Sequence, residues 1–235
     1  MEYVAVIHAR GGSVRVPKKN IRNLGNVPLI AWTIRAANKS ICNRVIVSTD
    51  SNEIAEITLE YGAEVPFLRP KELSEDLASE LVTQHAIRFH EKELGKPIKL
   101  AITIQPTTPF LTFEDINKSI NIININQEID SVFTAGPIVQ RPEWMFSIDK
   151  ESGKALKLSS QKILGERGIS QNLPELWHPN GGAYITMRET LFNQNALIGE
   201  NPGIHRMDLF SSVDIDEEID FLIAEKILEY KSIEF

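Results

Sequence analysis

Short apolar runs alternate with amphipathic stretches along the first 135 residues. Each run predicts a strand, and the runs lie at 3–8, 44–49, 64–68, 99–105 and 131–135. Spacing of three and four residues between apolar positions predicts helices over 28–38, 52–61, 81–94 and 113–124. Strands separated by helices of this length are typical of βαβ units with right-handed crossovers. The pattern therefore predicts an α/β fold around a mostly parallel sheet.

The pattern changes after Gly136. Residues 137–180 are rich in Pro, Gly and isolated aromatic residues, with weak alternation of period two near Trp144. We expect this segment to be a β-rich excursion that leaves the main sheet. A strand over 182–186 and an amphipathic helix over 216–230 follow it. The sequence thus predicts one domain over 1–235, with an arm at about 137–180.

Composition limits the class of protein. The chain has 25 Lys and Arg against 32 Asp and Glu, a net charge of −7, which argues against binding to nucleic acid. One cysteine, Cys42, allows neither an intrachain disulfide nor a cysteine metal cluster, and it suits a reducing compartment. No apolar run approaches the roughly 20 residues of a membrane helix, and the first residues carry no cationic leader. We expect a cytoplasmic protein.

The segment after the first strand is both small and cationic. Residues 9–20 contain two adjacent glycines and the cations Arg10, Arg15, Lys18 and Lys19. A loop in this place lies at the carboxyl edge of the sheet, where α/β folds bind ligands. Backbone N–H groups and positive charge together favour a phosphate-rich small molecule, although the spacing matches neither a Walker loop nor a dinucleotide fingerprint. The alternative is a solvated basic loop.

Two acids precede the final helix. Asp214 and Asp216 are two residues apart, so in an extended stretch both carboxylates face one side. Such a pair suits Mg²⁺, which keeps waters and substrate phosphates among its ligands. The alternative is helix capping, since an Asp before a helix is a good N-cap. One residue could cap while the other binds metal.

Two polar segments could contact a ligand. Pro179 and the two glycines after Asn180 predict a turn that presents the Asn180 amide, although an Asn bonded to its own backbone is the commoner case. Gln105 ends a predicted strand at the carboxyl edge, where its amide could read a base or ribose. The sequence contains neither a His-Glu-x-x-His zinc motif nor a Gly-x-Ser-x-Gly nucleophile elbow.

Taken together, six segments in this order and spacing resemble the CMP-sugar synthetases. The closest resemblance is to the CMP-nonulosonate group, typified by CMP-N-acetylneuraminate cytidylyltransferase. The segments are ARGGSVRVPKKN, VIVSTDSNEIAEITLEYGAEV, RPKELSEDLAS, IQPTTPF, HPNGGAYI and SSVDIDEEIDF. They cover nearly the whole chain.

The resemblance implies a fold, a reaction and partners. The fold would be the three-layer, Rossmann-like α/β domain of nucleotide-diphosphosugar transferases, and the arm would hold a homodimer together. The reaction would join CTP and a nine-carbon 2-keto sugar acid to give the CMP-sugar and pyrophosphate, with Mg²⁺ as cofactor. The C2 hydroxyl of the sugar would attack the α-phosphate.

The resemblance also assigns residues. CTP would contact Arg10, Gly12, Ser13, Lys19, Asn20 and Arg69. The sugar would contact Gln105, Asn180 and Tyr184, and magnesium would bind Asp214 and Asp216. Catalysis would depend on Arg10, Lys19, Asp214 and Asp216.

Three positions depart from the family pattern. Val14 stands where a lysine is usual, and Arg15 or Lys18 could compensate. Leu111 and Ser170 each replace an arginine, and Arg167 lies three residues before Ser170. These departures leave the sugar open among neuraminic, legionaminic and pseudaminic acids. The alternative hypotheses are a CMP-KDO synthetase, a nucleotidyltransferase for another nucleotide, and a non-catalytic nucleotide-binding protein of the same fold.

Overall fold

A six-stranded sheet forms the centre of the computed structural model, which describes residues 2–74, 78–158 and 174–235. The strand order is β10-β6-β9-β5-β1-β4. The strands are β1 (Tyr3–His8), β4 (Arg44–Ser48), β5 (Leu100–Ile104), β6 (Ser131–Pro137), β9 (Trp177–Met187) and β10 (Pro202–Arg206). Only β9 runs against the others, between β5 and β6. The prediction of a mostly parallel sheet is confirmed.

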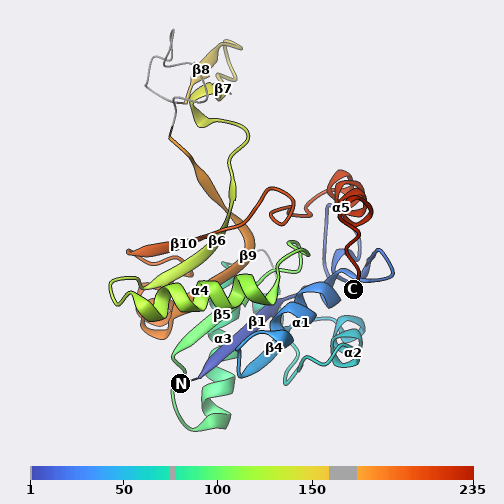
Figure 1. Cartoon of the computed structure of the whole chain (residues 1–235), viewed down its shortest axis with the longest axis vertical. Helices are drawn as coiled ribbons and strands as arrows, with labels where there is room; N and C mark the ends of the chain where they lie inside the picture. Colours follow the sequence, from blue (N-terminus) through green and yellow to red (C-terminus); the bar gives the residue numbers. More distant parts are fainter. Residues whose placement is uncertain (1, 75–77, 159–173) are drawn as a thin grey trace.

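Helices cover both faces of this sheet, which gives three layers (Figure 1). On one face lie α1 (Leu29–Lys39) and α4 (Phe113–Ile125), with α2 (Asn52–Glu60) beside α1, and α3 (Ser79–Leu94) covers the other. Along β1, Ala5 and Ile7 belong to the core on the α1 side, whereas Val4 and Val6 belong to the core on the α3 side. Burial on both faces explains why this strand is an uninterrupted apolar run. None of the helices in the described ranges is long and apolar enough to cross a membrane.

Some elements differ from the prediction. The expected strand at 64–68 forms only two isolated bridges, Ile46–Glu64 and Thr49–Leu68, because Pro66 has no N–H to donate in a continuous ladder. Strand β10 was not predicted. The remaining short elements are β2 (Asn23–Leu24), β3 (Val27–Pro28), η1 (Lys19–Ile21), η2 (Lys71–Leu73), η3 (Pro142–Trp144) and the π-helix at Thr190–Gln194. The last helix, α5, spans Glu218–Lys231.

The predicted turn around Asn180 is wrong, because this segment lies inside β9. Phe133 of β6 pairs with Tyr184, and Ala135 pairs with Pro179, so residues 180–183 bulge opposite Thr134 alone. Gly181 has a φ of 76°, in the left-handed region where a side chain is unfavourable. The Gly pair therefore makes a bulge in a strand rather than a turn between strands.

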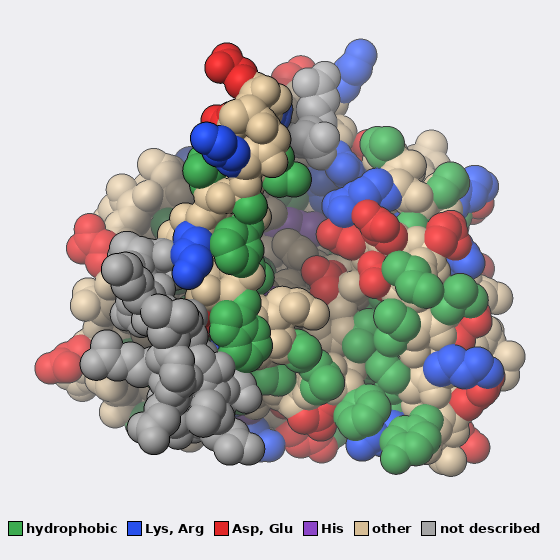
Figure 2. Space-filling view, turned by 90° about the horizontal axis from the view of Figure 1, so that it is seen from above, with side chains coloured by type: hydrophobic (Ala, Val, Ile, Leu, Met, Phe, Trp, Pro, Cys, Tyr) green, Lys and Arg blue, Asp and Glu red, His purple; other side chains and the backbone are tan. Residues whose placement is uncertain are grey.

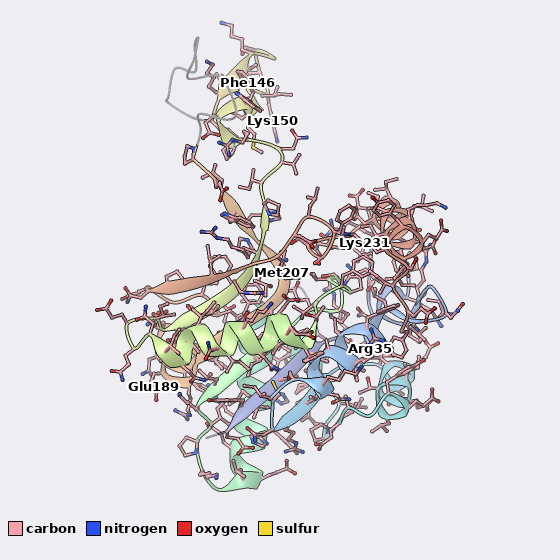
Figure 3. The ribbon with its side chains drawn as sticks, viewed as in Figure 1. Arg35, Phe146, Lys150, Glu189, Met207 and Lys231 are labelled. Atoms are coloured by element: carbon pink, nitrogen blue, oxygen red, sulfur yellow. The ribbon has the colours of Figure 1, made fainter. Side chains whose placement is uncertain are left out.

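The β-rich arm leaves the sheet where β6 ends and β9 begins (Figure 1). Its described part carries an antiparallel hairpin of β7 (Phe146–Ile148) and β8 (Ala155–Lys157). Phe146 lies near the end of the arm, far from the sheet (Figure 3). The prediction of a β-rich excursion is confirmed for this part. Residues 159–173, with Arg167 and Ser170, lie outside the described residues.

Candidate active site

A cleft of about 340 Å³ opens at the carboxyl edge of β1 and β5, and the hollow near the middle of Figure 2 shows this face. Its lining includes residues from the 9–20 loop, the end of β5 and the segment before α5. Eight of the eleven residues singled out in the sequence line it: Arg10, Ser13, Lys19, Asn20, Arg69, Gln105, Asp214 and Asp216. The fold thus brings the amino-terminal loop and the carboxyl-terminal acids together.

The charge of the cleft is opposite to that of the whole chain. Four cations line it, namely Arg10, Arg15, Lys19 and Arg69, against two carboxylates, Asp214 and Asp216, a formal balance of +2. The chain as a whole carries −7. A concave cationic surface on an acidic protein attracts a compact anion and is not explained by overall composition.

Hydrogen bonds fix the path of the 9–20 loop. The Gly11 N–H donates to Asp50 Oδ1 at 2.8 Å, and Asn20 Nδ2 donates to the Arg10 carbonyl at 2.9 Å. Val16 is buried in the core beside Phe221 of α5. The loop is therefore attached at both ends and at its middle, so its cations are held over the cleft.

Both acids face the cleft because Ile215, between them, faces the core. The Ile215 side chain is fully buried, and its N–H donates to the Thr107 carbonyl at 2.8 Å. In this extended stretch, alternation directs Asp214 and Asp216 the other way. The predicted same-side placement of the two carboxylates is what the structure has.

Neither acid is needed as the cap of α5. The N-cap residue is Glu217, and the Asp220 carboxylate accepts hydrogen bonds from the N–H groups of Asp216 (2.8 Å) and Glu217 (2.7 Å). Glu217 and Asp220 therefore cap this helix, and the carboxylates of Asp214 and Asp216 line the cleft instead.

The two carboxylates differ in their electrostatic environment. Partial burial would raise the pKa of Asp216, but the hydrogen bond and charge of Lys19, together with Arg15, lower it below its usual value. Asp214 reaches solvent at the cleft surface, yet the surrounding protein limits its hydration and raises its pKa, and the negative charge of Asp216 adds to this effect. Two acids with pKa values pushed apart are typical of a functional site.

At the other side of the cleft, Arg69 lies close to His8. The buried Arg69 guanidinium donates to Ser48 Oγ at 3.1 Å, and burial lowers its pKa to about 10. His8 Nε2 contacts Thr83 Oγ1 at 3.0 Å, and burial, aided by the Arg69 charge, lowers the pKa of His8 to about 3. His8 is therefore neutral near pH 7. The sequence analysis did not single out His8. A polar side chain at the last position of an otherwise apolar strand could have indicated it.

Comparisons with known proteins identify the family of this chain. The profile of the family described as "Cytidylyltransferase" matches residues 4–205. The chain belongs to the cytidylyltransferase family. It is 33% identical to the CMP-N,N'-diacetyllegionaminic acid synthase of Legionella pneumophila, with 97% of each chain covered. It is 34% identical to N-acylneuraminate cytidylyltransferase A of Danio rerio, with 94% of this chain and 50% of that protein covered.

The fold has solved counterparts. A CMP:2-keto-3-deoxy-manno-octonic acid synthetase complexed with CTP matches with a TM-score of 0.70, over 98% of this chain and all of that one. Its sequence identity of 17% limits that likeness to the fold. As a cytidylyltransferase, the protein is an enzyme of the nucleotidyltransferase class.

Three of the residues singled out in this cytidylyltransferase do not line the cleft. Gly12 is exposed on the loop, and Asn180 is only 1% exposed. Asn180 Oδ1 accepts from Thr134 Oγ1 at 2.7 Å and from the Gly182 N–H at 3.1 Å, while Nδ2 donates to Ser212 Oγ at 3.1 Å. These bonds favour the structural alternative for Asn180. Tyr184 is partly buried, and burial, with the negative charge of Asp214 adding to it, raises the pKa of Tyr184.

Two departures from the family pattern have distinct surroundings. Val14 is 84% exposed at the border of the cleft, so it places an apolar side chain beside the loop cations. Leu111 is buried in the core with residues such as Ile116 and Ile120 of α4, so it lies in packing rather than at the site.

The donor set suits a hard divalent cation. The described residues contain no group of three or more His, Cys, Asp or Glu side chains that could hold a metal ion. Mg²⁺ needs fewer protein ligands, because one or two carboxylates commonly bind it together with waters and substrate phosphates. Asp214 and Asp216, which share the cleft with four cations, fit that requirement.

Proposed function

We propose that this cytidylyltransferase joins CTP to a nonulosonic acid of the legionaminic or sialic type, giving the CMP-sugar and pyrophosphate. The observation that carries this proposal is the meeting of four cations and two carboxylates in one cleft at the sheet edge. The names of its relatives, a legionaminic acid synthase and an acylneuraminate cytidylyltransferase, support this substrate class.

The chemistry is a displacement at phosphorus. The C2 hydroxyl oxygen of the sugar acid attacks the α-phosphorus of CTP, and the bond from that phosphorus to the oxygen that bridges to the β-phosphate breaks. Pyrophosphate leaves with this oxygen and its electron pair, and the hydroxyl proton passes to water. Transfers of this kind depend on positioning and on neutralising charge. Arg10 and Lys19 bind the triphosphate and balance the charge that develops on the leaving pyrophosphate. Arg69, buried at the opposite side, helps to hold the nucleotide.

Asp214 and Asp216 are the residues that would hold magnesium. A divalent cation held by these carboxylates would supply positive charge to the phosphate oxygens and make the α-phosphorus more electrophilic. Ile215, which lies between the two acids, packs in the core, and its N–H donates a hydrogen bond to the carbonyl of Thr107, just after β5. This main-chain hydrogen bond attaches the segment that carries both acids to the edge of the sheet.

The sugar end of the cleft is formed by Gln105 and the β9 bulge. Gln105 lines the cleft, and its Oε1 would lie 3.0 Å from a Cβ added at Gly181. A Cβ at this position would press on the Gln105 amide, and the φ of 76° also favours glycine there. We assign sugar contact to Gln105, whereas Asn180 and Tyr184 shape the wall behind it.

We propose that the arm is the contact surface of a homodimer. Its hairpin exposes Trp144, Phe146, Ile148, Leu156 and Leu158. An isolated two-stranded hairpin is marginally stable in water, so apolar side chains on such a hairpin need a covering surface. A second copy of the chain would cover them. Phe146→Asp should shift the protein to monomer in analytical ultracentrifugation, whereas Ile125→Asp, at an exposed site on α4, should not. A Phe146→Asp protein that sediments like wild type would contradict the dimer.

Pyrophosphate release tests the substrate. The four nucleoside triphosphates would be combined with N-acetylneuraminate, N,N'-diacetyllegionaminate, pseudaminate and KDO. We expect release with CTP and a legionaminic or sialic acid. Release with KDO alone would favour the eight-carbon rival, and no release with any pair would favour a non-catalytic binding protein.

Two variants test the residues. Asp216→Ala should lower kcat by at least about a hundredfold with a smaller effect on CTP binding. Arg10→Ala should lower kcat/KM far more than Lys71→Ala, since Lys71 is exposed and lies outside the cleft lining. Near-normal turnover of Asp216→Ala in Mg²⁺, or equal effects of the two cation variants, would contradict the assignment.

A further inference from the structure

Both carboxylate oxygens of Asp216 already have a cationic partner within the chain. Lys19 Nζ lies 3.1 Å from Oδ1, and Arg15 Nη2 lies 3.0 Å from Oδ2. A divalent cation bound by Asp216 needs one of these oxygens and repels the positive charge next to it. The bound cation would therefore weaken the ion pair on the oxygen that it shares.

Differences in burial and bonding decide which pair opens. The Lys19 side chain is 14% exposed, and its ammonium also donates to the Ile215 carbonyl at 2.8 Å. The Arg15 side chain is 62% exposed, and its bond to Asp216 is the only one that the described residues offer it. Exposed ion pairs contribute little free energy, so the Arg15 pair breaks at small cost while Lys19 stays.

A released Arg15 remains inside the cleft lining, beside Arg10 and Lys19. Lys18, the other loop cation that could serve there, donates to both carboxylate oxygens of Glu53 at 2.9 and 3.0 Å and lies outside the lining. A guanidinium offers two parallel N–H donors to a phosphate, which a lysine does not. Arg15, rather than Lys18, is therefore the loop cation that could join Arg10 and Lys19 on the triphosphate.

We infer that Arg15 is an exchange residue, which pairs with Asp216 in the absence of ligands and moves to the triphosphate when a divalent cation takes Asp216 Oδ2. This inference rests on the proposed function for the identity of the nucleotide. Arg15 then competes with the metal for Asp216 and also binds the nucleotide. Its removal should therefore raise the affinity for the metal and lower the affinity for CTP. Loss of an ordinary surface ion pair would not produce that split.

The test measures binding of each ligand to Arg15→Gln without turnover. Titration calorimetry with Mn²⁺ alone should show affinity about two- to fivefold tighter than wild type, the range that breaking an exposed ion pair allows. Binding of CTP in the presence of Mg²⁺ and no sugar acid should be about five- to tenfold weaker, from the loss of a charge-assisted contact to phosphate. High salt should shrink the Mn²⁺ difference by screening the competing guanidinium.

Lys18→Gln is the matched control, because it removes a cation of the same loop outside the cleft. It should leave both affinities near wild type. Unchanged or weaker Mn²⁺ binding by Arg15→Gln, or unchanged CTP binding, would overturn the inference while wild-type selectivity for CTP left the proposed function intact. A wild-type protein without affinity for CTP would overturn the proposed function and the triphosphate half of the inference, and the Mn²⁺ titration would still decide the other half.

Discussion

Asn180→Ala separates two roles for this residue, sugar contact and support of the fold. The Asn180 side chain lies in the β9 bulge and bonds to Thr134 of β6 and to Ser212, on the segment that leads to Asp214. Its Nδ2 also lies 3.2 Å from the sulfur of Met207, which lies at the sheet in Figure 3. We expect the substitution to destabilise the protein, because the amide joins three parts of the chain.

The size of the effect follows from the groups left behind. Without Asn180 Oδ1, the buried Gly182 N–H loses its acceptor, which costs about 1–3 kcal/mol. Thr134 Oγ1 can turn to the Ala183 carbonyl at 3.3 Å, so it adds little. The space vacated by the amide adds roughly 1 kcal/mol. The total of about 2–4 kcal/mol would lower Tm by roughly 5–12 °C for a chain of this length.

Unfolding and steady-state kinetics together make the assay. Asn180→Ala should lower the urea midpoint, while KM for the sugar acid, measured well below Tm, changes less than about twofold. Gln105→Ala is the comparison, because Gln105 lines the cleft. It should raise KM for the sugar acid with little effect on stability. Unchanged stability of Asn180→Ala, combined with a tenfold rise in that KM, would refute the reasoning and restore Asn180 as a sugar contact.

Other predictions follow from single contacts. The pKa of His8 is about 3 in the folded chain, below its ordinary 6.5, so stability falls as pH drops through that window. Urea unfolding should show His8→Leu losing up to about 2 kcal/mol less than wild type between pH 7 and 5, and an equal loss would contradict this. Gly182→Ala should destabilise about as much as Asn180→Ala, since its Cβ would lie 2.8 Å from Thr134 Oγ1; an unchanged Tm would refute it. Asp220→Ala should lower stability by about 1 kcal/mol in thermal unfolding, through loss of the acceptor at the start of α5, and also reduce kcat, because Asp220 holds the Asp216 N–H. If Asp220→Ala lost stability but kept full activity, Asp220 would have no role in positioning Asp216.

The sequence predicted best where burial alone determines structure. Strands β1 and β5 are mostly apolar because helices cover both of their faces, so their runs were easy to recognise. Strand β10 could not be recognised in the same way. Its sequence PGIHR has no apolar run, and its residues alternate between exposed and half-buried at the edge of the sheet. Its place is set by parallel pairing with β6, which is a long-range contact that no local pattern records.

Local patterns also misread the Gly pair at 181–182. Pro and Gly beside Asn predict a turn in an isolated peptide, but here two neighbouring strands continue on either side. The side chain of Thr134 fills the bulge by accepting from the Ala183 N–H at 2.8 Å. Thr134 lies 49 residues before Ala183 in the chain, so no local pattern indicates this contact. The local sequence therefore favours a turn, although the segment forms a bulge in the strand.

The reversed direction of β9 explains why residues near its start pack behind the cleft, next to Gln105. Parallel strands bring functional residues to a site at their carboxyl ends, as His8 and Gln105 show for β1 and β5. Because β9 runs the other way between β5 and β6, its first half lies beside those carboxyl ends, with Ala183 paired to Ile104. The bulge at 180–183 therefore packs behind Gln105, and its bonds to Thr108 and Ser212 connect the end of β5 to the segment that carries Asp214. Strand β9, which looks interrupted in the sequence, thus fixes the position of the acids relative to the edge of the sheet.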